Sequence, residues 1–186
     1  MKLTFLKNIF YLSSILLFVT VCNKQSNAAF GGYFTVDFDI NQWELIRKAE
    51  NKLDEGPVKL LYQMKADQGY FLDITIYNPH DEYSMSSDPD EFFRQTNQSA
   101  ANKKHNFIQS KTKVINSIHY QDSLFYEKGT LERATFTGHI AKRDYIVLFN
   151  LFYNRRASNG AVLYNQESMT LEFEKILSSF KDLSSN

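Results

Sequence analysis

The chain has 186 residues, with 21 Lys and Arg against 21 Asp and Glu, and 43% of its residues are hydrophobic. A net charge of zero leaves no basic excess for phosphate contacts, which argues against a general nucleic-acid-binding protein. The hydrophobic content excludes a disordered chain, and three Pro with seven Gly exclude collagen-like and low-complexity sequences. We therefore expect a compact domain, while the composition indicates no particular biochemical activity.

The N-terminus has the pattern of a secretory signal. A basic start, Met1–Lys7, precedes an uncharged apolar run, Ile9–Val21, which is shorter than the roughly 20 helical residues that span a bilayer. Small residues predict cleavage between Ala28 and Ala29, or one residue later. The sequence thus predicts a signal peptide at 1–28 and a single α+β domain at 29–186, exported to the periplasm or the extracellular space. An uncleaved N-terminal anchor is the alternative.

Removing the predicted signal changes the charge and the cysteine count. The segment carries three lysines and no acidic residue, so the 21 basic residues fall to 18 against 21 acidic ones. Cys22 is the only Cys, so the mature chain would rely on its hydrophobic core without disulfides. Alternatively, Val19–Cys22 resembles an incomplete bacterial lipobox, in which Val21 replaces the usual small residue. Cys22 would then be lipidated, and only in that case do we expect a membrane contact.

The first half of the predicted domain combines strands with a helix. Alternating apolar and polar residues predict a strand over 33–38. Apolar residues at near-helical spacing predict a helix over 41–55, which ends before Gly56 and Pro57. Period-two patterns over 58–65 and 71–77 then predict a hairpin.

A second helix and a β-rich segment follow. Asp88 and Pro89 provide a helix start signal, and the helix is predicted to run to about Lys104. The segment after it contains four predicted strands, at about 107–120, 123–128, 131–141 and 144–153. The last of these is nearly continuous in apolar residues, which suits a central strand covered on both faces.

The chain closes with an amphipathic pattern. From about Gln166, apolar residues recur on one helical stripe, which predicts a C-terminal helix. The expected fold is therefore α+β, an antiparallel sheet with a central helix and a C-terminal helix packed on it. The residues of the stripe are Met169, Phe173, Ile176, Leu177 and Phe180.

This order of elements resembles the PsbP-like group of α/β/α sandwiches. Three pieces carry the likeness: Phe34–Phe38 followed by Trp43, the apolar strand Tyr145–Tyr153, and the terminal Ile176–Lys181. Members of the group are mostly non-enzymatic accessory, docking or chaperone-like proteins, so the resemblance implies binding rather than catalysis. No functional residue is carried over from the group.

Motifs for catalysis are absent from the sequence. There is no Gly-x-Ser-x-Gly elbow, and the mature chain has no Cys for thiol chemistry. The four His lack the spacing of a preset metal site. We therefore predict no catalytic, cofactor-binding or metal-binding residue and no cofactor, and the alternative is a secreted hydrolase with an unrecognised Ser or acid/His site.

Two groups of titratable residues have alternative interpretations. His119 and His139 could face each other across paired strands, and the pattern around His139 favours a solvated surface His over a metal ligand. An acidic group near residue 88 could bind calcium, but capping of the following helix explains its last three members. The acidic group consists of Asp81, Glu82, Asp88, Asp90 and Glu91.

The chain is unusually rich in aromatic residues, with 16 Phe, 11 Tyr and one Trp. Most are expected in the core, whereas Tyr at strand ends and Arg in loops could form a binding surface. The sequence thus favours an exported, non-enzymatic envelope protein that binds an unknown protein or a small apolar ligand through a groove between sheet and helices. The candidate surface residues are Tyr83, Tyr153, Arg155, Arg156 and Tyr164.

Overall fold

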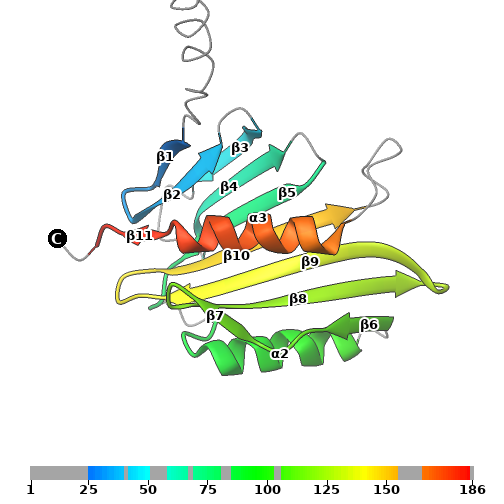
Figure 1. The fold of residues 1–186 in the computed structure, drawn as a ribbon. Helices are drawn as coiled ribbons and strands as arrows, with labels where there is room; N and C mark the ends of the chain where they lie inside the picture. Colours follow the sequence, from blue (N-terminus) through cyan, green and yellow to red (C-terminus); the bar gives the residue numbers. More distant parts are fainter. Residues whose placement is uncertain are drawn as a thin grey trace, which may run out of the picture.

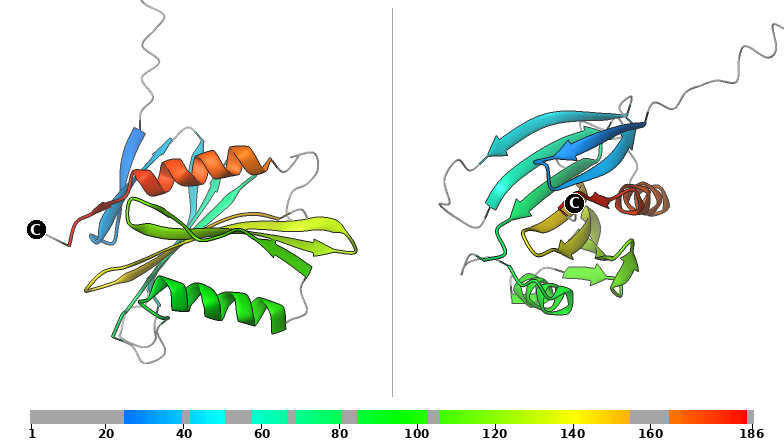
Figure 2. Two further views of the ribbon diagram at one scale, coloured as in Figure 1. Left: turned by 60° about the horizontal axis from the view of Figure 1, so that its bottom comes forward. Right: turned by 90° about the vertical axis from the view of Figure 1, so that its left-hand side faces the viewer.

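A large antiparallel sheet, with one helix on each face, organises the computed structural model of the protein (Figure 1). The two helices lie on opposite sides of the long hairpin of β8 (Ile118–Glu127) and β9 (Thr130–Ala141), as the left-hand view of Figure 2 shows. This confirms the predicted α+β class, with a central and a C-terminal helix packed on an antiparallel sheet. The structure describes residues 25–39, 42–50, 58–66, 69–80, 85–102, 106–154 and 165–184.

The large sheet contains eight strands. Its order is β3-β4-β5-β10-β9-β8-β6, and the short β7 also pairs with β8. The predicted strands at 58–65, 71–77, 131–141 and 144–153 are confirmed as β4, β5, β9 and β10. The strands are β3 (Trp43–Glu50), β4 (Val58–Ala66), β5 (Phe71–Tyr77), β6 (Asn106–Gln109), β7 (Lys113–Ile115), β8 (Ile118–Glu127), β9 (Thr130–Ala141) and β10 (Ile146–Asn154).

A smaller sheet brings the two ends of the described chain together. It has the order β1-β2-β11, from β1 (Gln25–Phe30), β2 (Phe34–Asp39) and β11 (Lys181–Asp182). Gly31 and Gly32 have positive φ values of 58° and 77° in the β1–β2 turn, a conformation that favours Gly. The strand predicted at 33–38 is confirmed as β2. The predicted cleavage position after residue 28 falls inside β1.

The helix predicted over 41–55 is wrong, because residues 43–50 form the edge strand β3. A bulge between Leu45 and Arg47 interrupts the pairing with β4, so the apolar residues do not keep a period of two. Backbone pairing with β4 outweighs the local helical spacing, which leaves Leu45 and Ile46 about half exposed (51% and 49%).

The single strand predicted over 107–120 is also wrong. The chain forms β6 and β7 and then turns at Asn116 and Ser117 into β8. Both turn residues have positive φ values, 48° and 64°, as a two-residue hairpin turn requires. Without the usual Gly, this turn escapes prediction from the sequence. Lys128 and Gly129 make a similar turn from β8 to β9, where a turn was predicted.

Both later helices are confirmed. Helix α2 (Pro89–Asn102) lies on one face of the large sheet, and α3 (Gln166–Ser178) lies on the other. Among the residues that the structure describes, no helix combines the length and the apolarity needed to span a membrane. The predicted stripe of α3 is buried, since Met169, Phe173, Ile176 and Leu177 are at most 1% exposed and Phe180 follows the helix into the core.

The main core lies between the large sheet, α3 and the small sheet. Its strand residues alternate with those of the other face, so Leu72, Ile74 and Ile76 of β5 are all fully buried, as predicted. Gly138 lets α3 approach closely, because an added Cβ would lie 3.3 Å from both Phe173 and Leu177 side chains. A separate small cluster of Phe92, Phe93 and Leu148 holds α2 on the opposite face.

Candidate functional site

A row of polar side chains crosses the large sheet on the face that α2 covers. Each member lies directly opposite the next one in the antiparallel register, so all of them project to the same face. The row runs from β4 through β5, β10 and β9 to β8. We call it the polar row, and it consists of Gln63, Asp73, Asn150, Thr137 and Gln121.

Hydrogen bonds satisfy the two ends of the polar row but not its centre. Gln63 Nε2 donates to Asp73 Oδ1 at 3.1 Å, and Thr137 Oγ1 donates to Asn150 Oδ1 at 3.0 Å. Gln121 receives a bond of 3.4 Å from Asn97 of α2. Among the described residues, no hydrogen bond joins Asp73 to Asn150, and the Asn150 amide nitrogen has no acceptor. The middle of the row therefore offers both donor and acceptor capacity.

A groove of about 460 Å³ lies between the centre of the polar row and α2. This volume falls within the range of small-molecule sites in proteins. The floor is polar and is made by Asp73, Ser123, Thr135, Thr137 and Asn150. The walls are mainly apolar and are made by Phe92, Phe125, Leu148 and Phe152. We call this space the α2 groove.

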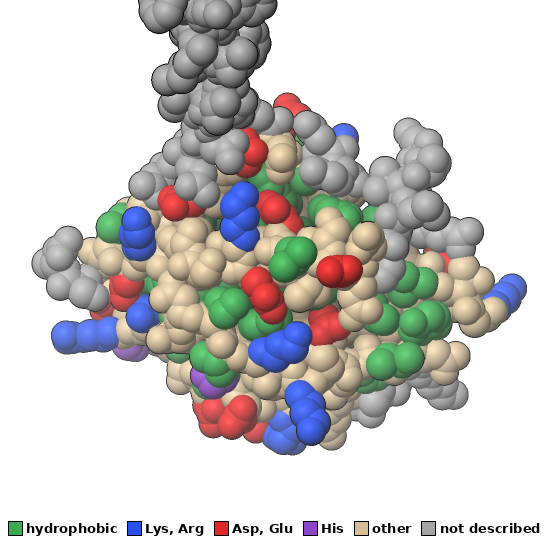
Figure 3. All heavy atoms as spheres, in the orientation of Figure 1, with side chains coloured by type: hydrophobic (Ala, Val, Ile, Leu, Met, Phe, Trp, Pro, Cys, Tyr) green, Lys and Arg blue, Asp and Glu red, His purple; other side chains and the backbone are tan. Residues whose placement is uncertain are grey.

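The α2 groove continues outward along the helix. A second hollow, also about 460 Å³, shares Phe92, Thr96, Phe125 and Arg133 with the first. Hydrophobic side chains also gather over the right-hand ends of β8 and β6 in Figure 3. Ile108 of β6 is 62% exposed, and it pairs with Leu124, which packs against the main core, so Ile108 lies on the other face of the sheet from the groove. The groove thus extends along α2 as two adjoining hollows.

Arg133 of β9 is held at the groove by three contacts. Its guanidinium carbon lies 5.7 Å from the ring centroids of both Phe125 and Phe152, and its Nε donates to Thr135 Oγ1 at 2.9 Å. Stacking on aromatic faces suits the planar guanidinium. Within the described part of the chain, its two terminal amino groups have no hydrogen-bonded or ion-paired partner. Arg133 therefore presents a fixed positive charge with free donors.

Asp73 places a carboxylate on the floor of the same groove. Burial raises the pKa of Asp73, although the hydrogen bond from Gln63 and the positive charges of Arg133 and Arg47 oppose this shift. The side chain is half-buried. The groove therefore contains one group of each charge.

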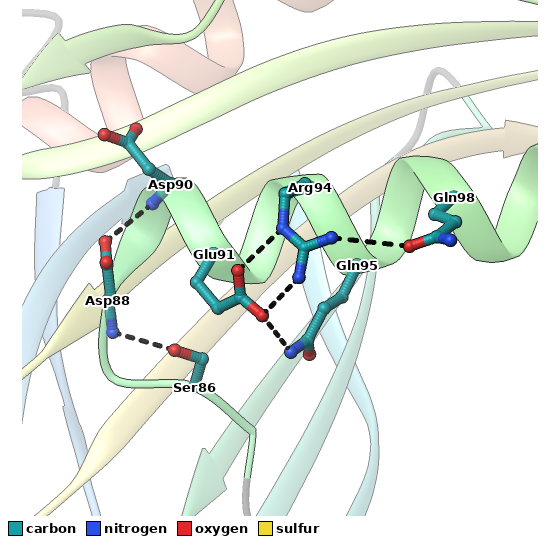
Figure 4. A network of polar contacts seen from close by, with 7 residues as sticks. All are labelled: Ser86, Asp88, Asp90, Glu91, Arg94, Gln95 and Gln98. Atoms are coloured by element: carbon teal, nitrogen blue, oxygen red, sulfur yellow. Dashed lines mark hydrogen bonds and ion pairs between the residues drawn. The ribbon is translucent and has the colours of Figure 1, made fainter.

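The start of α2 is fixed by a capping network (Figure 4). Asp88 Oδ1 accepts a bond of 3.0 Å from the backbone N–H of Asp90, and Ser86 Oγ accepts from the N–H of Asp88. Glu91 pairs with Arg94 one turn later at 2.7 Å. These contacts position the helix over the sheet with its Phe92 pointing inward. The capping role predicted for Asp88 is confirmed.

The calcium alternative has no support within the described residues. They contain no cluster of three or more His, Cys, Asp or Glu side chains that could hold a metal ion. Asp88 acts as a helix cap and Glu91 as an ion-pair partner. Asp81 and Glu82 lie outside the described residues.

His139 lies beneath α2 and is not the solvated surface residue that the sequence predicted. It is 0% exposed, its ring stacks on Phe92 with 4.6 Å between centroids, and its Nε2 lies 3.0 Å from the Ser86 carbonyl oxygen. The predicted strand face is correct, and His119 pairs with it across β8 and β9. The error arose because α2 covers that face. Burial lowers the pKa of His139.

Of the predicted partner surface, Tyr153 is the residue that the described part of the chain includes. Tyr153 is only 6% exposed, because β10 extends to residue 154 and pairs Tyr153 with Ala134 of β9. The expectation that Tyr153 lies at an exposed strand end is therefore wrong. Tyr83, Arg155, Arg156, Tyr164 and the proposed lipidation site Cys22 lie outside the described residues.

The sequence patterns do not single out the residues that line the α2 groove. Asp73 and Thr137 follow the alternation of half-exposed strands, so their positions resemble a solvent face. Asn150 is the residue whose sequence context could have indicated the site, since it is a polar residue inside the mainly apolar β10. Arg133 stands near the start of β9 and shows no distinguishing pattern in sequence.

Comparison with known proteins identifies the fold. No protein-family model matches the chain, and no curated protein sequence matches it significantly. Among solved structures, the chain is similar to the solution structure of cyanobacterial PsbP (CyanoP) from Synechocystis sp. PCC 6803. The TM-score is 0.53 at 10% sequence identity, over 88% of this chain and 95% of that protein. The fold is PsbP-like. At this identity the similarity applies to the fold alone.

Proposed function

We propose that the protein is an exported, non-enzymatic accessory protein of the cell envelope, which holds a small ligand in the α2 groove. The observation that carries this proposal is the polar row lying under a helix. A covered sheet face is normally apolar, because buried polar groups without partners cost free energy. Here the polar groups at the centre of the row face a groove that is large enough for a small ligand and has apolar walls.

The mixed lining changes the predicted chemistry of the ligand. A purely apolar ligand would leave the polar floor without partners, whereas an amphipathic one contacts both surfaces. The PsbP-like fold supports an accessory role, and the N-terminal signal pattern supports export to the periplasm or the extracellular space.

The hydrolase alternative is less well supported by the geometry. Ser123 and Asp73 both line the α2 groove, but His139 is directed toward the Ser86 carbonyl instead. Among the described residues, no Ser hydroxyl is hydrogen bonded to a His ring, as an activated nucleophile requires. We therefore favour binding over hydrolysis.

The groove is tested with N-phenyl-1-naphthylamine, a neutral aromatic probe whose fluorescence rises in apolar surroundings. Thr96→Trp places a bulky ring on α2 at the groove, because Thr96 is exposed and lines both hollows. We expect it to weaken probe binding by about tenfold or more. Gln98→Trp is the matched control, since Gln98 is exposed on the same helix and lines neither hollow. Equal binding by both variants would overturn the proposal, and so would a wild-type protein that binds neither this probe nor 2-naphthoate nor 2-naphthamide.

Export is tested separately by mass spectrometry of the protein recovered from bacteria that express the full chain. Ala29 or Phe30 as the first residue supports removal of a signal peptide. A lipid-modified Cys22 at the start supports the membrane-anchored alternative instead. Recovery of the intact chain from the cytoplasm would contradict export.

A further inference from the structure

The charged groups of the α2 groove narrow the ligand class. Arg133 is the basic residue that lines both hollows, and it lies between two aromatic rings rather than in an ion pair with a described residue. We propose that the groove binds a small aromatic carboxylate, whose carboxylate group is held by Arg133. This inference rests on the proposed function and specifies its ligand.

Arg133 has the geometry of a prepared carboxylate receptor. A guanidinium binds a carboxylate through two parallel N–H···O bonds, and such charge-assisted bonds are stronger than neutral ones. Phe125, Phe152 and the bond to Thr135 already restrict the side chain. Less conformational entropy is therefore lost when an anion binds.

The walls favour a flat apolar body attached to the anion. Phe92 comes from α2 on one side of the groove, and Leu148 and Phe152 come from β10 on the other. Phe152 is itself stacked on Phe71 at 5.6 Å, so its ring is held in place. Aromatic ligands gain both area burial and ring contacts from such walls.

The polar floor gives the ligand one orientation. Asp73 repels an anion, so the carboxylate is directed to Arg133 and away from the centre of the polar row. Opposite Asp73 in the polar row, the free amide nitrogen of Asn150 can bind a polar substituent at the end of the ligand away from Arg133. The groove therefore discriminates between the two ends of a molecule.

The experiment compares 2-naphthoate with 2-naphthamide, which has the same ring system without the charge. Binding is measured by calorimetry and by nitrogen-15 chemical shifts of groove residues. We expect wild-type protein to prefer the acid by about tenfold or more, the scale of a charge-assisted hydrogen bond. In Arg133→Gln, the preference should disappear while binding of the amide changes little.

Two further variants separate charge from packing. Arg133→Lys keeps the positive charge but loses the two parallel N–H donors of the guanidinium, so it should retain part of the preference for the acid. Arg94→Gln removes an exposed cation of α2 that pairs with Glu91 and does not line the groove, so it should bind both probes as the wild type does.

The outcomes distinguish this inference from the proposed function. If the groove binds N-phenyl-1-naphthylamine but not 2-naphthoate, or binds acid and amide equally, the carboxylate assignment is wrong and the binding function stands. A preference for the acid that survives in Arg133→Gln also contradicts the assignment. If none of the three probes causes shifts at the groove residues, both proposals fail.

Discussion

The two faces of the large sheet have opposite chemistry at positions that differ by one residue in every strand. The polar row under α2 has a neighbouring row under α3 and the small sheet, in which the residues are buried and mostly apolar. Because side chains alternate along a strand, a one-residue shift in register would exchange the two rows. The row on the α3 side consists of Tyr62, Ile74, Phe149, Gly138 and Tyr120.

This difference makes the two faces contribute unequally to the stability of the molecule. The α3 face buries large side chains such as Phe149 and Phe173 completely, so it supplies most of the hydrophobic stabilisation. The α2 face keeps polar groups under a helix whose buried apolar residues belong to a small cluster, with Phe92 and Leu148. The proposed binding function agrees with this arrangement, because binding sites commonly lower stability.

The largest effect is expected from Phe173→Ala on the α3 face. Phe173 is fully buried and contacts the rings of Tyr120 and Phe136, so its loss should cost about 3–5 kcal/mol of unfolding free energy. Phe92→Ala is the matched change on the α2 face and should cost less, because its cluster is small. Urea unfolding of both variants measures the difference. Equal losses would contradict the division between the faces.

A smaller effect is expected from pH, through His139 under α2. Burial lowers the pKa of His139 below the unfolded value of about 6.5. The unfolded chain therefore binds more protons below this pH, so stability should fall as the pH decreases below about 6.5. His119 on β8 and Asp88 at the start of α2 are the charged neighbours, and they act in opposite directions.

The pH effect is measured by urea unfolding at several pH values and by direct titration of the His139 ring signals in NMR spectra. His139→Gln should lose this part of the pH dependence. His80→Gln, at an exposed position, should retain it. A ring of His139 that titrates at or above the ordinary value would show that α2 does not bury it in solution.

The smallest effect is expected from Asp73→Asn in the polar row. Burial raises the pKa of Asp73, so the charged form is disfavoured in the folded protein and the neutral amide should be stabilising. The gain should stay below about 1 kcal/mol, because the half-exposed site is screened by solvent. The native state binds more protons than the unfolded one here, so the gain should vanish at low pH. Glu44→Gln, at an exposed position on β3, should show no such gain in thermal unfolding.

Local patterns predicted the elements whose burial follows a regular period. Strand β5 and helix α3 were found because Ile74 and Phe173 belong to repeats that match a strand and a helix. The bulge after Leu45 broke this period, so β3 was mistaken for a helix. Asn116 and Ser117 adopt a turn that their residue types do not demand.

The candidate site could not be predicted because it depends on contacts between distant segments. Asp73, Thr137 and Asn150 become one row only through the pairing of β5, β10 and β9. The same applies to His139, whose strand face was correctly predicted. Its burial depends on the position of α2, which residue alternation within β9 does not encode.

The pairing of β2 with β11 has a consequence for when the protein can fold. Thr35 lies opposite Lys181 and Phe34 opposite Asp182, so the small sheet cannot close until the chain has been synthesised to the end of β11. Pairings between segments this distant form slowly, because a long loop must be closed first. For a chain that crosses a membrane unfolded, as export through a general secretion channel would require, this delay favours translocation over premature folding in the cytoplasm.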